Sequence, residues 1–502
     1  MQLHLTFLVT FLWSFSGVVS WSDNTQRIFK DDFMFGVASA SFQVEGAWNI
    51  DGKGESIWDR YLHTRGDTSG DDAADSYNNY KRDVEMIREL GADFYRFSVS
   101  WPRVMPTGLP NKINEKGLQY YDNLINELNK HNIIPVVTLY HWDLPQSLQD
   151  LGGWTNPLII QWFEDYARLI FDRFAHKVRY WITMNQPNSV CMEGYGEVVL
   201  APGLGKKGVA DYMCVKNIML AHARAYRLYE AEYRNKYKGS VGIAVSVNWI
   251  EPVNNKTENI KASDEFRDYL WGLFLDPIWS ASGDFPKSVK EIVAKKSKEE
   301  GYSKSRLPSF TKEEIKMLKG SSDFLGLNHY TTHLASRAMS DFDIDVSLSQ
   351  RGQWPTSQSS WLRNVPYGFY RVCIHLNKVY DYPTILVTEN GVSTSKGLRD
   401  SDRIKYLQGY LRALLLAIED GTRVMGYTAW SLLDNVEWAA GTSERFGLYE
   451  VDFDSKDKKR TARMSALFYK NVISDRIVAD NFEPKDLSIK VSNRRTRADK
   501  EL

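Results

Sequence analysis

The 502-residue chain has few cysteines, and this scarcity excludes one class of protein. Its three cysteines, Cys191, Cys214 and Cys373, allow one disulfide at most and leave an odd thiol. The chain is therefore no disulfide scaffold, and a hydrophobic core must supply its stability. Sequence spacing does not decide which two cysteines meet.

Net charge is also absent. Lys and Arg together number 63, as do Asp and Glu, so no net field attracts nucleic acid or anionic lipid. A small neutral partner fits this balance, and the sequence leaves a homo-oligomer open. The 16 Trp and 27 Tyr suit stacking against sugar rings as well as ordinary core packing. No cluster of Cys, His and Asp has metal-ligand spacing, so no metal is expected.

Long apolar runs are scarce as well. Only Leu3–Val19 is almost wholly apolar, and no other stretch approaches the roughly 18 apolar residues of a membrane helix. Small residues at the end of this run, Val18-Val19-Ser20, predict a signal peptide over residues 1–20. We therefore expect a protein of the secretory pathway with no membrane span.

Two further segments bear on localisation. Asn255-Lys256-Thr257 is an acceptor sequence that predicts N-glycosylation of Asn255. The terminus Asp499-Lys500-Glu501-Leu502 resembles an ER-retention signal with its first two residues exchanged, which makes ER retention a second hypothesis beside secretion. The plainer interpretation is that residues 486–502 form a charged tail.

Short runs rich in β-branched and aromatic residues recur along the chain. Eight are predicted to be strands: Phe33–Ser39, Phe94–Trp101, Ile134–Trp142, Tyr180–Gln186, Val241–Val247, Asp323–Tyr330, Thr384–Asn390 and Val424–Leu432. Continuous apolar strands that alternate with helices indicate a parallel sheet buried on both faces. Eight such units predict a single α/β domain over residues 21–485, a (β/α)8 TIM barrel.

Amphipathic segments separate several of these strands. Four are predicted to be helices, namely Asp75–Leu90, Ile113–Asn129, Ile159–Phe174 and Asp402–Glu419. Gly91 is expected to end the first of them. Lys287–Lys319 indicates a solvated helical insertion, and Leu334–Asn364 a long loop. Long loops on the C-terminal face of a barrel usually shape the binding site.

Gly203–Gly208 matches the spacing G-x-G-x-x-G of a dinucleotide-binding turn. That turn should leave a strand directly, open a helix and meet an acidic residue about 20 residues later. Here Pro202 interrupts the approach and the run is predicted to be a loop. No nucleotide cofactor is expected.

Gln186 and Glu389 are predicted to end the fourth and seventh strands. In a barrel the C-terminal ends of strands converge on one place, so residues far apart in sequence can face each other. Retaining glycoside hydrolysis uses two carboxyl groups about 5–5.5 Å apart, one as nucleophile and one for proton transfer. The two positions suit such a pair, although one carries an amide. An isolated Glu at a strand end is more often a surface or capping residue, so the surrounding motifs must decide.

Those motifs are specific. Thr183–Pro187 reads T-M-N-Q-P and Leu386–Gly391 reads L-V-T-E-N-G, and the two resemble the signature pair of family 1 glycoside hydrolases, the β-glucosidase family. The first motif normally reads T-x-N-E-P in that family. Further segments are similar to family motifs in the same order: Phe35–Gly46, Tyr95–Trp101, Tyr140–Pro145, Leu327–Tyr330 and Trp430–Trp438. The resemblance thus extends over nearly the whole chain after the signal peptide.

The resemblance implies a role for each matching residue. Glu389 would be the nucleophile, Gln186 would occupy the acid/base position, Arg96 would keep the nucleophile ionised and Tyr330 would position it. The implied substrate-binding set is Gln43, His141, Asn185, Asn328, Trp430, Glu437, Trp438 and Phe446. Within this set Asn185 would bind the 2-hydroxyl and Glu437 the 4- and 6-hydroxyls, with Trp438 at the 3-hydroxyl and Trp430 under the ring.

The amide at position 186 affects the two steps of the expected mechanism that need proton transfer. Gln186 cannot donate a proton to a leaving oxygen or take one from water, and general acid–base catalysis contributes about 10²–10⁴-fold. An aglycone that leaves as a stable anion needs no proton. Myrosinase-type members of the family share this glutamine and use an external base such as ascorbate. Our leading hypothesis is a retaining β-glucosidase for activated aglycones, a thioglucosidase that hydrolyses glucosinolates through a glucosyl-enzyme on Glu389.

Other interpretations stay open. The chain could be an O-β-glucosidase with an impaired or replaced acid/base, or a weakly catalytic sugar-binding protein like the lactase-like and klotho members. Glu193 or Glu197 could supply the missing acid, although both are predicted to lie in the following loop or helix. A sulfated aglycone would favour a cation at the rim, and the loop residues Lys206, Lys207, Arg337 and Arg351 are candidates.

Overall fold

The computed structural model describes residues 27–66, 69–340 and 342–491. Eight strands close into a barrel in the order β1-β11-β10-β7-β5-β4-β3-β2. Their bounds are β1 Met34–Ala38, β2 Phe94–Ser98, β3 Ile134–Tyr140, β4 Tyr180–Asn185, β5 Ser240–Ser246, β7 Leu325–Asn328, β10 Ile385–Asn390 and β11 Val424–Trp430. All neighbouring pairs are parallel. The predicted (β/α)8 barrel is confirmed.

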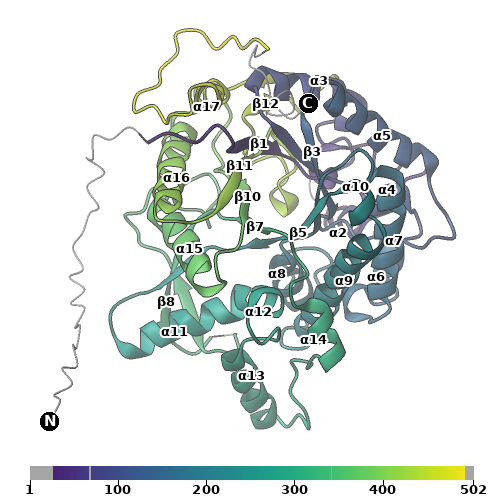
Figure 1. Ribbon diagram of the computed structural model, residues 1–502, viewed down its shortest axis with the longest axis vertical. Helices are drawn as coiled ribbons and strands as arrows, with labels where there is room; N and C mark the ends of the chain where they lie inside the picture. Colours follow the sequence, from purple (N-terminus) through teal and green to yellow (C-terminus); the bar gives the residue numbers. More distant parts are fainter. Residues whose placement is uncertain (1–26, 67–68, 341, 492–502) are drawn as a thin grey trace.

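Helices form a ring around the barrel, whose strands occupy the centre of Figure 1. The longer ones are α3 Ser76–Leu90, α5 Glu115–Lys130, α7 Ile159–Phe174, α9 Ala210–Glu232, α11 Thr257–Arg267, α13 Lys287–Glu299, α15 Pro366–Val379, α16 Ser401–Glu419 and α17 Met464–Asp475. Shorter ones are α1 Ser41–Val44, α2 Ile57–Arg65, α4 Trp101–Val104, α6 Gln146–Gln149, α8 Pro187–Ser189, α10 Arg234–Tyr237, α12 Leu273–Trp279 and α14 Lys312–Leu318. Two π-helical segments, Val190–Gly196 and Asp268–Gly272, and two 3₁₀ turns, Gly153–Thr155 and Trp438–Ala440, complete the set.

The four predicted helices are present, with ends that differ by at most two residues. α3 ends where Gly91 takes a left-handed φ of 72°, as the sequence indicates, because glycine adopts that conformation without a Cβ clash. α7 buries Ile159, Phe163, Tyr166 and Ile170, whose spacing of three or four residues places them on one face.

An apolar layer fills one end of the barrel. It consists of Met34, Phe94, Val136, Ile182, Ala244, Phe324 and Leu386, and all of these except Ala244 come from the N-terminal halves of the strands or just before them. Layers of this kind make a TIM barrel a packed core rather than a pore. Polar side chains are therefore left to the opposite end, where the strands finish.

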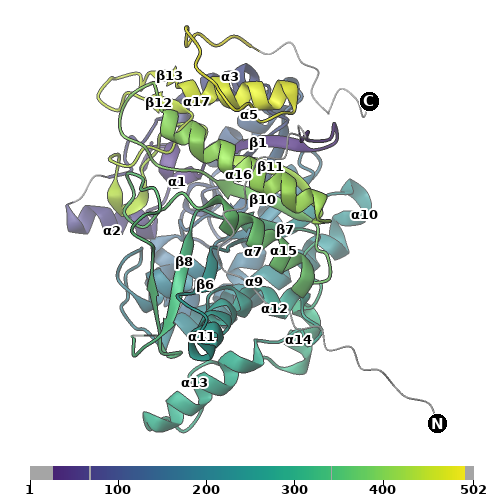
Figure 2. The ribbon, with the colours of Figure 1, turned by 90° about the vertical axis from the view of Figure 1, so that its left-hand side faces the viewer.

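One prediction about the loops is wrong. Leu334–Asn364 is not a plain loop, because β8 (Thr332–Arg337) and β9 (Val346–Ser349) join β6 (Trp249–Pro252) in a three-stranded sheet. These strands are too short to show a period in sequence, and their pairing is long-range. Lys287–Lys319 is a helical insertion as predicted, and α13 projects from the body of the molecule in Figure 2.

Cys191 and Cys214 form a disulfide with a Cα–Cα distance of 5.4 Å. It ties the π-helical segment that follows β4 to α9, while Cys373 is free and buried. In the ranges that the structure covers, no helix is long and apolar enough to cross a bilayer. The predicted signal peptide and the Asp499–Leu502 terminus lie outside the described residues.

Candidate active site

Glu389 lies next to the end of β10 and is 3% exposed. Its Oε1 accepts a hydrogen bond from Arg96 Nη1 at 2.6 Å, and its Oε2 accepts one from the Tyr330 hydroxyl at 2.7 Å. Arg96 comes from β2 and also donates to the Thr388 carbonyl at 3.0 Å. Charge-assisted hydrogen bonds of this length hold a carboxylate in one orientation. The register of β10 against β7 shifts between Val387 and Glu389, and such irregularities often re-aim a side chain beside a functional site.

Asn185 and Asn328 extend this network across the barrel. Asn185 Oδ1 accepts from Arg96 Nη2 at 2.6 Å and from Asn328 Nδ2 at 2.9 Å. Asn328 Oδ1 in turn accepts from Thr388 Oγ1 at 2.6 Å. Two donors on Asn185 Oδ1 fix which way its amide faces, so Asn185 Nδ2 is the atom that points at His141.

His141 follows β3 and is 2% exposed. Burial, and then the positive charge of Arg96, lower the pKa of His141 well below its ordinary value, so the ring is neutral. Asn185 Nδ2 lies 2.9 Å from His141 Nε2, which must therefore accept, leaving the proton on Nδ1. His141 Nδ1 is buried without a partner in the described structure. An unmade hydrogen bond costs about 1–3 kcal/mol, so a ligand oxygen is the natural acceptor.

Gln186 follows Asn185 directly at the end of β4. Its backbone N–H donates to the Ala244 carbonyl at 2.8 Å. Its backbone adopts the left-handed conformation, with φ 45° and ψ 59°. A non-glycine residue there is uncommon and typical of functional sites. Gln186 is 8% exposed, and within the described part of the chain its side chain makes no hydrogen bond. The site therefore places an amide without a partner beside the Asn185–Arg96–Glu389 chain of contacts.

The remaining predicted residues form a wall from β11 to Phe446. Trp430 ends β11, and His141 stacks on Trp430 and Trp438 with ring centroids 5.8 and 5.9 Å apart. Phe446 packs edge-on against Tyr330 at 6.3 Å. All are buried or nearly so. The structure thus brings every predicted catalytic and sugar-binding residue to one end of the barrel.

Glu437 and Gln43 meet in this wall. Gln43, on α1, donates through Nε2 to Asn435 Oδ1 at 3.1 Å, to the Val436 carbonyl at 3.1 Å and to Glu437 Oε2 at 3.3 Å. Its Oε1 is buried and lacks a partner among the described residues. Burial, then the negative charges of Glu444 and Glu389, raise the pKa of Glu437 to about 8. Gln43 and His141 thus each hold an unused hydrogen-bonding atom, which suits a ligand rich in hydroxyl groups.

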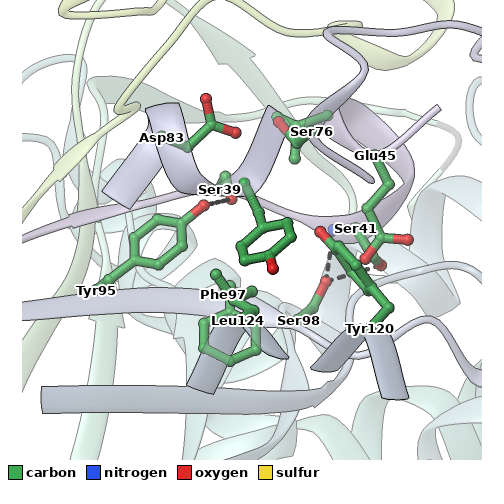
Figure 3. Close-up of a pocket in the computed structure, with 12 residues that line it drawn as sticks. Ser39, Ser41, Glu45, Ser76, Asp83, Tyr95, Phe97, Ser98, Tyr120 and Leu124 are labelled. Carbon is green, nitrogen blue, oxygen red and sulfur yellow. Dashed lines mark hydrogen bonds between the residues drawn. The ribbon is translucent and has the colours of Figure 1, made fainter. Parts of the chain in front are cut away.

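A small cavity next to α1 is shown in Figure 3 and is lined by polar and apolar side chains. Its volume is about 10 Å³, which fits a single water molecule and no sugar. Ser39 Oγ pairs there with the Tyr95 hydroxyl, and Ser98 Oγ donates to Ser41 Oγ at 2.9 Å while accepting from the Ser41 N–H at 2.7 Å. These bonds fix the start of α1 and with it the position of Gln43.

Glu193 and Glu197, the candidates for a replacement acid, follow Gln186 on and after the π-helical segment Val190–Gly196. Burial raises the pKa of Glu193 to about 7, whereas Glu197 pairs with Lys207 at 2.9 Å. The carboxylate of Glu389 contacts Arg96 and Tyr330 and neither of these two residues. Glu193 therefore has suitable protonation but no contact with the nucleophile.

Most of the candidate rim cations already have acidic partners. Lys207 pairs with Glu197, Arg337 pairs with Glu265 and Arg351 lies 3.7 Å from Glu251. Lys206 is exposed and, in the ranges that the structure covers, forms no ion pair. The sequence does not distinguish the four residues, because the acids that pair with Arg337 and Arg351 lie far away along the chain.

Sequence reasoning missed two residues of the site. Trp142 donates from Nε1 to the Asn185 carbonyl at 2.9 Å, and its ring lies 4.4 Å from that of Trp438. Its position inside the matched segment Tyr140–Pro145 is a signal that could have identified it. Trp361, 42% exposed, packs edge-on against Tyr330 at 5.7 Å from an unpatterned segment, so no sequence signal marks it. In the described residues no group of His, Cys, Asp or Glu could hold a metal ion.

The site has a buried carboxylate held by an arginine and a tyrosine at the C-terminal end of a (β/α)8 barrel. Unused polar atoms and indole rings lie beside it, an arrangement typical of a glycoside hydrolase. Residues 25–477 match the family model of glycosyl hydrolase family 1. The chain belongs to that family, and its resemblance to it in sequence is confirmed.

Relatives and solved structures agree with this assignment. The chain is 45% identical to Myrosinase 1 of Brevicoryne brassicae over 459 residues, covering 89% of this chain and 98% of that protein. It is 43% identical to human lactase/phlorizin hydrolase over 461 residues, covering 89% of this chain but only 24% of that longer protein. A rice β-glucosidase variant with a Glu-to-Gln change, solved in a covalent complex with Glc, aligns with a TM-score of 0.82 and 37% identity, covering 88% of this chain and 98% of that one.

Proposed function

We propose that this enzyme cleaves β-glucosides with retention and is specialised for aglycones that leave as stable anions, with thioglucosides such as glucosinolates as its substrate class. The single observation that carries the proposal is the amide of Gln186 in an otherwise complete site. Glu389 keeps both its hydrogen-bond donors, and the glycone wall is intact. A site that had lost its function would have little reason to keep them together.

In the first step Glu389 attacks the anomeric carbon, and the bond to the aglycone breaks with its electron pair leaving on the aglycone. Gln186 supplies no proton, so the rate depends on how well the aglycone carries negative charge. Arg96 and Tyr330 hold the attacking carboxylate in place. A sulfur leaving group that departs as a stabilised anion needs no general acid in this step.

In the second step water attacks the anomeric carbon of the glucosyl ester and releases Glu389. The proton of that water must pass to a base, and Gln186 is no base. An external base such as ascorbate, bound beside the ester, would take it. We therefore propose that the second step limits turnover and responds to added anions.

The glycone would be held by the atoms that the fold leaves unused. Gln43 Oε1 accepts from a sugar hydroxyl and His141 Nδ1 donates to one. Asn185 binds at the 2-hydroxyl, a contact that strengthens in the transition state. Glu437 takes the 4- and 6-hydroxyls, and Trp438 the 3-hydroxyl. Trp430 stacks under the ring, and Asn328 and Phe446 support this arrangement through Asn185 and Tyr330.

The relatives support both halves of the proposal. The 45% identity to a protein named Myrosinase 1 supports the substrate class, because glucosinolates are the substrates proposed above. The rice variant with a Glu-to-Gln change holds Glc covalently, which supports sugar transfer to the enzyme in a family member that lacks one glutamate. The route through the secretory pathway remains part of the proposal, and Asn255 is exposed in the loop between β6 and α11, as an N-glycan requires.

A substrate series tests the leading proposal. We expect release of aglycone from a glucosinolate and from 2,4-dinitrophenyl β-glucoside, and little release from methyl β-glucoside, because only the first two leave without a proton. Added ascorbate or azide should accelerate the first two. Initial rates with and without each anion decide the matter, and equal turnover of all three substrates without any anion would contradict the proposal.

Glu193→Gln tests whether a second residue replaces the missing acid. Because Glu193 contacts neither Glu389 nor Arg96, we expect kcat/KM for 2,4-dinitrophenyl β-glucoside to change less than about twofold, against the 10²–10⁴-fold loss of a true acid/base. Glu197→Gln serves as the matched control. A hundredfold drop in kcat/KM in Glu193→Gln but not in Glu197→Gln would show instead that Glu193 transfers the proton.

The sugar-binding alternative makes a different prediction from the same site. A protein that binds glucosides without turnover would show no burst of aglycone and no covalent glucosyl label on Glu389 with any of the three substrates. An impaired O-β-glucosidase would turn over the activated aryl glucoside but not the glucosinolate. Among the described residues no second acid contacts Glu389, which is the observation that favours these two alternatives.

A further inference from the structure

A groove lies beside the end of β10, the strand that carries Glu389, and is separate from the site described above. One wall is the segment between β9 and α15, and the other is the β10–α16 loop together with the start of α16. Its volume is about 640 Å³, within the range of small-molecule sites. In the described structure none of the predicted catalytic or sugar-binding residues lines this groove. It is therefore a second concave surface of a size that fits a small ligand.

Hydrogen bonds give the groove a defined shape. The Ser393 carbonyl accepts from the Gln358 N–H at 3.3 Å, and Ser393 Oγ accepts from the Ser359 N–H at 2.8 Å. These two bonds join the walls to each other. Within the first wall, the Asn364 N–H donates to the Pro355 carbonyl at 2.9 Å. The two walls are thus held together without a ligand, as is usual in small-molecule sites, which are largely pre-formed.

Two cations on the groove lack an acidic partner. Lys396 and Arg399 both line it and are exposed. Within the described part of the chain neither side chain makes an ion pair or a hydrogen bond. An ammonium and a guanidinium on one loop can share an oxyanion, because both form charge-assisted hydrogen bonds to phosphate oxygens. A phosphate monoester carries a charge of about −1.5 to −2 at neutral pH, which matches two cations.

The carboxylates on the groove do not cancel this charge. Asp400 pairs with the buried Arg403, and it also accepts from the Ser465 N–H at 2.9 Å and from Ser465 Oγ at 2.6 Å. Asp402 Oδ1 lies 3.4 Å from the Nζ of Lys405, the third cation of the lining. Among the described residues no other acid lines the groove. The charge left for a ligand is therefore positive.

Asn364 adds an acceptor that has no donor. The residue lines the groove, and its Oδ1 is buried without a hydrogen-bond partner among the described residues. Buried polar atoms are normally hydrogen-bonded, so an exception beside a groove indicates a missing partner. That partner is a donor, which a ligand hydroxyl supplies and a fully ionised phosphate does not. Thr356, Ser357 and Gln358 add neutral polar groups to the same wall.

We propose that this groove is a second ligand site, which binds a small polyol that carries a phosphate group. The phosphate lies against Lys396 and Arg399, and a hydroxyl of the ligand donates to Asn364 Oδ1. The proposal goes beyond the hydrolysis of glucosides and does not depend on it, because the groove shares no lining residue with the predicted glycone-binding set.

Calorimetric titration with three probes tests the two parts of this recognition. Glycerol 2-phosphate carries the charge and the hydroxyls, ethyl phosphate carries the charge alone, and glycerol carries the hydroxyls alone. We expect the wild type to bind glycerol 2-phosphate most tightly, ethyl phosphate more weakly and glycerol not measurably. Saturating glucose should leave the Kd of glycerol 2-phosphate unchanged, because the two ligands occupy different sites. Absence of saturable binding of glycerol 2-phosphate, or its displacement by glucose, would overturn the proposal.

The double variant Lys396→Ala/Arg399→Ala locates the phosphate. We expect it to weaken the binding of both phosphate esters by about tenfold or more, because both charge-assisted contacts are lost. Lys298→Ala/Lys304→Ala is the matched control, since these two lysines are exposed, form no ion pair in the described structure and do not line the groove. The control makes the same change in net charge and should leave Kd unchanged. Equal affinities in wild type and the first double variant would contradict the assignment.

Asn364→Leu tests the hydroxyl contact. We expect this variant to bind glycerol 2-phosphate no more tightly than ethyl phosphate, while the Kd of ethyl phosphate stays at the wild-type value, because only the hydroxyl contact is removed. Retained binding of ethyl phosphate also shows that the variant is folded. If the preference for glycerol 2-phosphate survives in Asn364→Leu, the assignment of a polyol to this groove is wrong.

Discussion

Gln186→Glu is expected to raise kcat/KM for methyl β-glucoside by about 10²–10⁴-fold, the usual contribution of general acid–base catalysis. Gln186 is 8% exposed, and its side chain has no hydrogen-bond partner in the described structure. Burial would therefore raise the pKa of a carboxyl placed there. The new group would be protonated at neutral pH and able to donate to the leaving oxygen.

The pH dependence of kcat/KM also distinguishes the variant from wild type. A general acid must be protonated, so kcat/KM of the variant should decline as pH rises through the pKa of the new carboxyl, and wild type should lack that alkaline limb. Azide should accelerate wild type and lose its effect on the variant, because the new carboxylate activates water. Gln186→Asn, which keeps an amide, is the matched control. If Gln186→Glu and wild type cleave methyl β-glucoside at equal rates, the rest of the site cannot support acid-catalysed cleavage, and the prediction is wrong.

Removing the nucleophile is expected to have the larger effect. Glu389→Ala should lower kcat/KM for 2,4-dinitrophenyl β-glucoside on the order of 10⁶-fold, the size measured when a covalent nucleophile is removed from another hydrolase. No other carboxylate contacts Arg96 and Tyr330 in the described structure, so nothing takes its place. Steady-state kinetics with the activated glucoside measures the loss.

The stereochemistry of azide trapping distinguishes this result from simple unfolding. In wild type azide attacks the glucosyl ester, and two successive inversions give the β-glucosyl azide. In Glu389→Ala azide attacks the glucoside directly, and one inversion gives the α-glucosyl azide. Formation of the β product by the variant would exclude Glu389 as the nucleophile.

Stability must be followed in the same variants. Glu389 and Arg96 form a buried ion pair at 2.6 Å, and breaking such a pair from one side typically costs about 3–5 kcal/mol. Thermal unfolding of Glu389→Ala and of Glu389→Gln should show the smaller loss for glutamine, because its carbonyl oxygen can still accept from Arg96. A folded, inactive Glu389→Gln assigns the loss of rate to chemistry.

Much of the architecture was predictable because its signals are local. Each barrel strand is a mainly apolar run, since it is buried on both faces, and each predicted run overlaps one strand of the barrel. The ends were less certain: Phe94–Trp101 includes Trp101, which begins α4 rather than ending β2. The apolar run continues into the turn there, so composition does not mark where the strand stops.

Features that depend on long-range contact were not predictable. Three features join segments that are separate in the chain: the pairing of β8 and β9 with β6, the disulfide of Cys191, and the ion pairs of Arg337 and Arg351. The spacing of residues in one sequence does not specify such contacts, because many different folds are compatible with the same local pattern.

The family, the barrel and the change of chemistry at Gln186 could be predicted from the sequence, since motif residues and apolar runs are properties of neighbouring residues. How those residues act together depends on the folded structure. The three-dimensional structure shows Arg96 bridging Glu389 to Asn185, and it leaves one atom each of Gln43 and His141 without a partner among the described residues. The physical reason is that protonation, hydrogen-bond satisfaction and electrostatic coupling depend on distance in space and on exclusion of water, which the barrel creates when its strand ends converge.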